Sequence, residues 1–151
     1  MQERTKIRIV PLDKELVLQV AEIEALCFSE PWSRQAYLEA CDKEDYLYLV
    51  AVDEKGNAVG MCGLIIGMFE AEVMNVAVHP NYRGLGISHQ LMDALMDAGA
   101  VRGVKEYTLE VRVSNLAAIH VYEAHGFVSE GIRPGFYAKP EEDALIMWKR
   151  E

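Results

Sequence analysis

The stretch "VAVHPNYRGLGISHQLMDAL", residues 76–95, decides how the fold of this sequence is read. An apolar segment runs through a turn that contains Gly84 and Gly86 and continues directly into a pattern of helical period. A strand that enters a helix through a tight glycine turn leaves the first backbone N–H groups of the helix unpaired, at the positive end of the helix dipole. Such a turn favours an anion, most often a phosphate.

Three kinds of phosphate site have this outline. A Walker loop is excluded, because Gly86 is not followed by the lysine and hydroxyl residue that contact a nucleotide's phosphates and metal. A dinucleotide-binding turn has Gly84 and Gly86 in place but His89 where its third glycine belongs, although Glu110 lies about where a ribose-binding acid is expected. A coenzyme A site would use the same amides for its pyrophosphate and the preceding strand for its pantetheine arm. The turn alone leaves the last two open.

The length and composition of the chain favour a single soluble domain. The 151 residues predict a single domain, residues 1–151. With 24 acidic and 15 basic residues the chain does not suit a nucleic-acid surface, whereas a cationic partner or ordinary solubility both fit. Cys27, Cys41 and Cys62 are widely spaced, which predicts reduced thiols and no metal site. No leader or membrane-spanning run is evident, so we expect a cytoplasmic protein; its oligomeric state stays open.

Apolar periodicity predicts seven strands and four helices in the order β-α-α-β-β-β-α-β-α-β-β. Ser33 is expected to cap a helix, and Gly126 to end one. The order begins antiparallel and contains one strand–helix–strand crossover, which predicts a mixed α/β fold: a central twisted sheet of seven strands with helices on both faces. The predicted strands are Lys6–Val10, Tyr46–Val52, Ala58–Phe69, Glu72–Val78, Tyr107–Val113, Phe127–Tyr137 and Ala144–Lys149, and the predicted helices are Lys14–Phe28, Ser33–Cys41, Gly86–Val101 and Asn115–His125.

Two segments carry a resemblance to a known family. With this strand order, "MNVAVHPNYRGLGIS" (74–88) and "LEVRVSNLAAIHVYEAHGF" (109–127) resemble the GCN5-related N-acetyltransferases, the GNAT superfamily. Among these the chain looks most like the bacterial RimI-type enzymes, which acetylate the N-terminal alanine of a small-subunit ribosomal protein. The resemblance covers essentially the whole chain. It implies the GNAT fold, acetyl-CoA as co-substrate without a metal, and a protein N-terminus as acceptor, in the family a ribosomal protein.

The resemblance also implies where the coenzyme binds. Ser88 stands where the family has a glycine or alanine, so it keeps the backbone amide and adds a hydroxyl. The family's pyrophosphate-binding pattern falls on six consecutive residues, Arg83, Gly84, Leu85, Gly86, Ile87 and Ser88.

The strand and helix on either side of this turn would hold the rest of the coenzyme. By the resemblance, the backbone of Val76, Ala77 and Val78 pairs with the pantetheine arm, and an amide there polarises the thioester carbonyl. Asn115 would contact the coenzyme, and Tyr122, two helical turns later on the same face, would meet its sulfur. Without the motif, the three strand residues and Tyr122 would be read as core packing.

The acceptor side is implied by residues in three other segments. In RimI-type enzymes the glutamate at the position of Glu110 is taken as the general base, although a lone strand glutamate is usually solvated. Trp32, in "PWS", borders the family's substrate groove, or serves as a structural wedge. Tyr137 lies near the acceptor, in a segment where Pro134–Phe136 replaces the family's residues.

The leading hypothesis is direct acetyl transfer in a ternary complex, with Glu110 as base and Tyr122 as acid. One alternative is a GNAT enzyme that acetylates a small amine such as a polyamine. Another is a non-catalytic acetyl-CoA-binding regulatory module, against which the presence of both Glu110 and Tyr122 speaks.

Overall fold

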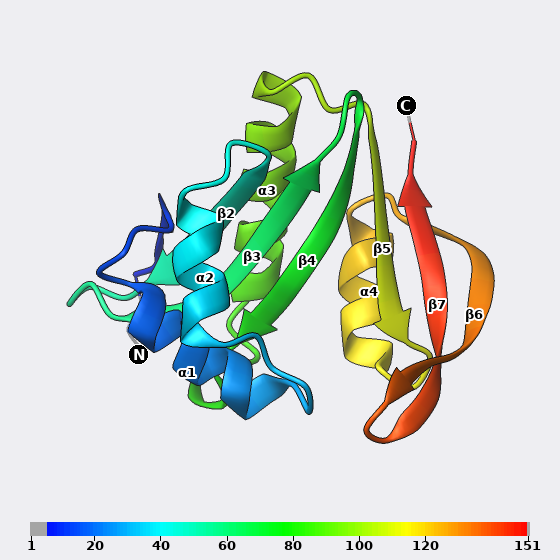
Figure 1. The fold of residues 1–151 in the computed structure, drawn as a ribbon, viewed down its shortest axis with the longest axis horizontal. Helices are drawn as coiled ribbons and strands as arrows, with labels where there is room; N and C mark the ends of the chain where they lie inside the picture. The colour runs from blue at the N-terminus through cyan, green and yellow to red at the C-terminus, as the bar shows by residue number, and fades with distance from the viewer. Residues whose placement is uncertain (1–5, 151) are drawn as a thin grey trace, which may run out of the picture.

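The computed structural model describes residues 6–150 and contains one seven-stranded sheet, ordered β1-β2-β3-β4-β5-β7-β6 (Figure 1). All neighbouring strands pair antiparallel except β4 and β5, which are parallel and joined by the predicted helical crossover. The fold class and element order predicted from the sequence are therefore confirmed. The strands are β1 (Arg8–Pro11), β2 (Tyr46–Val52), β3 (Ala58–Ile66), β4 (Glu70–Val78), β5 (Glu106–Arg112), β6 (Val128–Ala138) and β7 (Glu141–Lys149).

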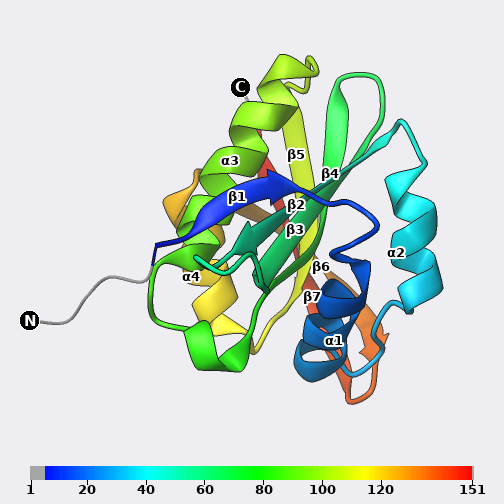
Figure 2. The ribbon, with the colours of Figure 1, turned by 90° about the vertical axis from the view of Figure 1, so that its left-hand side faces the viewer.

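Helices cover both faces of the sheet (Figure 2). One buried cluster joins the sheet to α3 and α4, around Leu91, Leu95 and Tyr122; the other joins it to α1 and α2, around Val20 and Tyr37. Ser33 caps α2 as predicted, its Oγ accepting from the Ala36 N–H at 3.1 Å. The helices are α1 (Val17–Cys27), α2 (Arg34–Cys41), α3 (Ile87–Val101) and α4 (Leu116–Ala124), with a short 3₁₀ helix η1 (Pro80–Tyr82) before α3.

The sheet opens between its two parallel strands. Beyond their short pairing, β4 and β5 diverge toward their C-terminal ends (Figure 1). Within residues 6–150, the edge of β4 that faces β5 therefore has no strand paired to it from Val73 to Val78. The Val78 carbonyl on that edge accepts from Arg83 and Cys27, and the other backbone groups there are available to another extended chain. The paired residues are Glu70, Ala71 and Glu72 with Glu106, Tyr107 and Thr108.

The β3–β4 hairpin lies differently from the prediction. The predicted strand ran through Phe69, but β3 ends at Ile66, and the Gly67 N–H donates to the Glu70 carbonyl at 2.7 Å to close a tight turn. Met68 and Phe69 are exposed at its tip, 86% and 59%. Because Met68 and Phe69 are apolar, the predicted strand was extended through residues that form a turn.

The last strand was also predicted too short. β7 begins at Glu141 instead of Ala144, and Glu142 pairs with Tyr137 on β6. The polar segment was read as a loop because the residues from Glu141 to Asp143 are all acidic, so no apolar alternation marks the strand.

The N-terminal elements start later than predicted. β1 covers Arg8–Pro11, and α1 begins at Val17 because Asp13 Oδ1 accepts from the Glu15 and Leu16 N–H groups and holds a turn first. Gly126 follows α4 with φ 92°, the predicted left-handed stop. No helix within residues 6–150 has the length and apolar character needed to span a membrane.

Candidate active site

Two cavities, of about 670 and 500 Å3, lie at the opening between β4 and β5. The first is lined by the turn before α3 and by α4. The second is lined by the end of α1, the loop after it, β5 and β6. Ligands in the two cavities would therefore meet at the residues that line both, which are Cys27, Phe28, Val76, Asn115, Ala118 and Tyr122.

The glycine turn delivers the N-terminus of α3 to the first cavity. Gly84 and Gly86 are both left-handed, with φ 79° and 77°, a conformation that side chains other than glycine rarely adopt. Gly86 is the residue that precedes α3, and it lines the cavity together with Ile87 and Ser88. Leu85 points elsewhere: it is 53% exposed and is not part of the lining. The turn has the geometry of an anion site at a helix N-terminus.

Arg83 closes the end of β4 beside that turn. Its Nε donates to the Val78 carbonyl at 3.3 Å and its Nη2 to Cys27 Sγ at 3.4 Å. All three residues, together with Val76 and Ala77, line the first cavity. A guanidinium thus stands between the unpaired strand edge and the anion-binding turn.

Asn115 and Tyr122 lie on α4 at the junction of the cavities. Asn115 Oδ1 accepts from the Ala118 N–H at 3.2 Å and caps the helix, as the sequence predicted. Tyr122 is 7% exposed, and burial raises the pKa of its phenol well above the usual value, with Tyr137 adding to the shift. Its hydroxyl therefore keeps its proton at neutral pH and can act as a donor.

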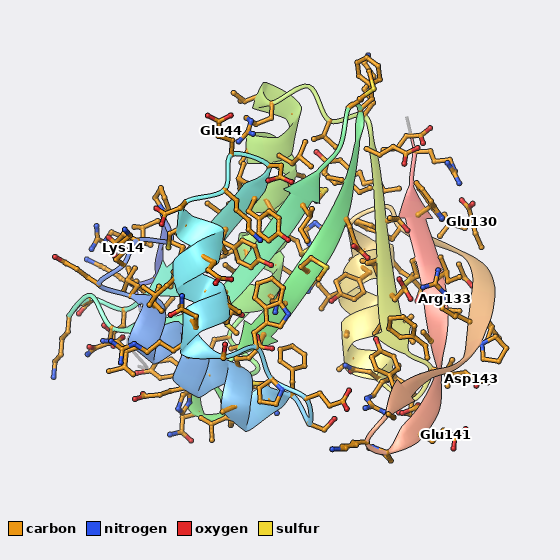
Figure 3. The ribbon with its side chains drawn as sticks, viewed as in Figure 1. Lys14, Glu44, Glu130, Arg133, Glu141 and Asp143 are labelled. Atoms are coloured by element: carbon orange, nitrogen blue, oxygen red, sulfur yellow. The ribbon has the colours of Figure 1, made fainter. Side chains whose placement is uncertain are left out.

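Glu110 faces the second cavity from β5. The neighbouring Leu109 and Val111 are buried in the core cluster beneath α3 and α4, as the strand alternation predicted. Among residues 6–150, Glu110 Oε2 is a buried carboxylate oxygen without a hydrogen bond. Arg133 of β6, labelled in Figure 3, brings its Nη1 to 3.1 Å from this oxygen, an ion pair that lacks hydrogen-bond geometry. Such an oxygen can accept a proton or a hydrogen bond from a ligand.

Glu72 stands on β4 in the same cavity and was not singled out from the sequence. Burial raises the pKa of Glu72, the charge of Glu110 raises it further, and Arg133 opposes both. Tyr137 lines the cavity too, and burial followed by the charge of Glu110 raises the pKa of its phenol. The second cavity is thus rich in carboxylates and suited to a cationic group.

Trp32 forms part of the wall of the second cavity. Its ring lies 5.2 Å from that of Tyr37 and 5.7 Å from that of Tyr48, centroid to centroid, and it lines the second cavity. The two readings of Trp32, groove border and structural wedge, are therefore compatible.

Arg112 fixes the β6–β7 hairpin near the second cavity. Its guanidinium lies 4.3 Å over the Tyr137 ring and binds Glu142 at 3.2 Å, the Pro140 carbonyl at 2.8 Å and Ser29 at 3.3 Å. These contacts occupy the positive charge of Arg112 within the protein.

Sequence reasoning also missed Glu24 and Asn75. Glu24 follows Val20 by four residues and so lies on the buried face of α1, where a carboxylate must find donors. Asn75 interrupts an apolar strand. A charge on the apolar face of a helix and an amide within a strand are signals that could have found both.

A sheet open at a parallel strand pair, with an anion-binding turn on one side and carboxylates on the other, places two ligands end to end. Residues 17–127 match the acetyltransferase (GNAT) family. The chain belongs to this family and is an N-acetyltransferase, as the resemblance implied. Among residues 6–150 there is no group of three potential side-chain ligands that could hold a metal.

Particular relatives narrow the class. The Salmonella typhimurium [ribosomal protein bS18]-alanine N-acetyltransferase is 36% identical over 129 residues, 83% of this chain and 85% of that protein. The crystal structure of the ribosomal-protein-S18-alanine N-acetyltransferase from Escherichia coli matches with TM-score 0.86 at 32% identity, over 95% of this chain and 93% of that one. A chain of the NatC complex, crystallised with Gag peptide and CoA, matches with TM-score 0.87 at 26% identity over 97% of this chain and 99% of that one.

Proposed function

We propose that this chain transfers the acetyl group of acetyl-CoA to the N-terminal α-amine of a protein that begins with alanine, a ribosomal protein as for the relatives. The observation that carries the proposal is the meeting of the two cavities around Val76 and Tyr122, with Glu110 on the acceptor side. The relatives' acceptor supports the choice of an N-terminal alanine.

Coenzyme A would occupy the first cavity. The amides at Gly86, Ile87 and Ser88 would bind its pyrophosphate, and the free edge of β4 would pair with the pantetheine arm as an added strand. Since Asn115 Oδ1 is used as the helix cap, its amide nitrogen would make the contact to the coenzyme. The residues present fit this ligand.

The acceptor amine would enter through the second cavity and lose its proton to Glu110, directly or through one water. The proton transfer is easier for an α-amine than for a lysine: with a pKa near 8 about a tenth is already neutral at pH 7, against well under about a tenth of a percent for a lysine. The Oε2 of Glu110, which forms an ion pair with Arg133 but accepts no hydrogen bond, supports this role.

Attack then forms the bond between the amine nitrogen and the acetyl carbon, and the carbonyl oxygen gains negative charge that a backbone N–H of β4 would stabilise. Collapse of this intermediate breaks the carbon–sulfur bond, and the leaving thiolate takes the proton of the Tyr122 hydroxyl. The nitrogen releases its second proton to solvent, and solvent returns a proton to Tyr122. Burial raises the pKa of Tyr122, so the hydroxyl carries its proton when the reaction begins. The products are the acetylated N-terminus and coenzyme A.

The test is mass spectrometry of acceptors incubated with the enzyme and acetyl-CoA. An alanine-starting peptide is expected to gain one acetyl group at its α-amine. The same peptide with a blocked N-terminus and an internal lysine, and the polyamine spermidine, serve as competitors. Acetylation of spermidine in preference to the peptide would replace the proposal with a small-amine acetyltransferase, and no acetylation of either would favour a binding module.

A further inference from the structure

An irregularity in β4 lies beside the junction of the two cavities. The register with β3 changes from Met61↔Ala77 to Gly63↔Met74, so β4 holds one extra residue there. Within residues 6–150, Asn75 is the one non-glycine residue with positive φ, at 54°. The bulge therefore centres on Asn75, directly before Val76, which lines both cavities. A bulge redirects the local backbone, and this one aims the part of β4 that would meet the thioester.

The side chain of Asn75 is held at both ends. Its Nδ2 donates to Glu24 Oε1 at 3.1 Å, and its Oδ1 accepts from the Tyr48 hydroxyl at 2.7 Å. The Tyr48 ring reaches this position because it packs on Gly63, where any Cβ would collide with the ring. Two hydrogen bonds thus stabilise a backbone conformation that costs free energy.

Glu24 connects this bulge to the wall of the acceptor cavity. It is 2% exposed, and its Oε1 also accepts from the Tyr37 hydroxyl at 2.5 Å. Its other oxygen, Oε2, accepts from the Trp32 N–H at 3.0 Å. One buried carboxylate therefore binds donors from β4, from α2 and from the loop between α1 and α2. Neither an amide nor an apolar side chain can accept from all three.

We propose that Glu24 is a positioning residue that fixes the Asn75 bulge of β4 and the Trp32 wall relative to each other, so that thioester and acceptor amine meet in line. The role rests on the proposed function. Glu24 acts through Asn75 and Trp32, because it accepts a hydrogen bond from each of them.

The hydrogen bonds allow a test by exchange of donor and acceptor. In Glu24→Gln the single amide oxygen can serve Trp32 or Asn75 but not both. In Asn75→Asp two carboxylates face each other, while aspartate still tolerates the left-handed backbone. In the double variant one N–H of the glutamine NH2 can donate to the aspartate and the other to the Tyr37 hydroxyl oxygen, while the glutamine oxygen accepts from Trp32. The Tyr48 hydroxyl keeps its acceptor.

Each single variant is expected to lower kcat/KM for an alanine-starting peptide by about tenfold or more, as is usual for a buried hydrogen bond to a charged group. Acetyl-CoA affinity, measured by calorimetry, should change by less than about twofold. The double variant should recover most of the loss, because the two sites form one network. Additive losses in the double variant would overturn the proposal.

A matched pair separates positioning from general stability. Tyr48→Phe and Tyr107→Phe each remove one phenolic hydroxyl from a buried ring, 7% and 5% exposed, but Tyr107 donates to the Met96 carbonyl, away from the cavities. Tyr48→Phe should lower kcat, and Tyr107→Phe should leave it unchanged even where Tm falls as much. Equal kcat in the two variants would assign the network a purely structural role.

Failure of the positioning role of Glu24 can be distinguished from failure of the proposed acetyltransferase function. If the parent protein acetylates no peptide, that function falls, and the positioning role is then read from amide hydrogen exchange at residues 75 and 76. Each single variant should speed exchange there, and the double variant should restore protection. Exchange unchanged in the single variants would overturn the positioning role by itself.

Discussion

Tyr122 carries the acid half of the proposed mechanism in one hydroxyl group. Tyr122→Phe keeps the ring's packing against Phe127 and removes the proton that the departing thiolate would receive. We expect kcat to fall by about 10²-fold or more while acetyl-CoA affinity changes little, within the usual range for loss of a general acid. Steady-state kinetics on an alanine-starting peptide, with calorimetry of acetyl-CoA, measures both. Near-normal kcat would make Tyr122 a core residue.

Glu110 carries the base half. Glu110→Gln keeps the size of the side chain and removes the proton acceptor, so turnover should fall most at neutral and lower pH. It should recover in part at high pH, where the amine, with a pKa near 8, loses its proton to solvent. A pH–rate profile of both enzymes is the measurement. An equal loss at every pH would indicate that Glu110 binds the acceptor instead of taking its proton.

For single residues, the sequence predicts the features that depend only on neighbours in the chain, such as the face of a strand on which a side chain lies. The alternation of β5 was enough to turn Glu110 away from Leu109 and Val111. The neighbours of Glu110 could not be predicted, because Glu72 and Arg133 reach it from strands far apart in the chain. The same limit applies to Glu24, whose three donors come from three different segments.

Among the elements, the β6–β7 hairpin is tied to the start of α4 by one carboxylate. Glu142 Oε2 accepts from the Ser114 N–H at 2.8 Å, and its Oε1 binds Arg112 at 3.2 Å. The hydrogen bonds from Ser114, followed by Arg112, lower the pKa of Glu142. A lowered folded-state pKa means that this contribution to stability is present above the unfolded pKa and is lost as pH falls through the folded one.

Glu142→Gln should therefore lower Tm at pH 7, where the ionised carboxylate is removed. The difference from the parent should shrink below about pH 4, as Glu142 itself becomes protonated. Thermal unfolding at a series of pH values tests this. The neighbouring Glu141, exposed at the same strand end, gives the control variant Glu141→Gln (Figure 3). A Tm difference for Glu142→Gln that is constant with pH would contradict the assignment.

Elements with a repeating apolar face were predicted almost to the residue, as for Tyr46–Val52. The ends of the hairpins were not predicted correctly. Met68 is apolar but lies exposed in a turn, and Glu142 is charged but is paired within a strand. Their ends are set by backbone hydrogen bonds and by partners across the fold.

For the whole molecule, the short pairing of β4 with β5 divides the sheet into two parts that a bound coenzyme would bridge. If the pantetheine arm pairs with β4, acetyl-CoA should slow amide hydrogen exchange along Val73–Val78. It should also raise stability by about 2.7 kcal/mol at a hundred times its Kd. Hydrogen exchange measured by mass spectrometry, with and without acetyl-CoA, tests the expected protection of β4. A thermal shift assay tests the expected gain in stability. Protection confined to the turn at Gly84–Ser88 would contradict strand pairing.

The opening of the sheet could not be read from the sequence. The crossover from β4 to β5 predicts two parallel neighbours, but how many residues pair depends on how the two halves twist and on Tyr122 of α4 packing beside the opening.

The shared lining of the two cavities also bears on inhibitor design. A compound that joins the sulfur of coenzyme A to the α-nitrogen of a short peptide by a two-carbon link would pass between Val76 and Tyr122 and fill both cavities at once. Once either half has bound, the other binds at high effective concentration, and affinity can exceed that of the separate halves by about 10²–10⁴-fold. Selectivity would come from the peptide half, which would lie against Glu72 and Phe136, whereas the coenzyme half would bind features that acetyltransferases share.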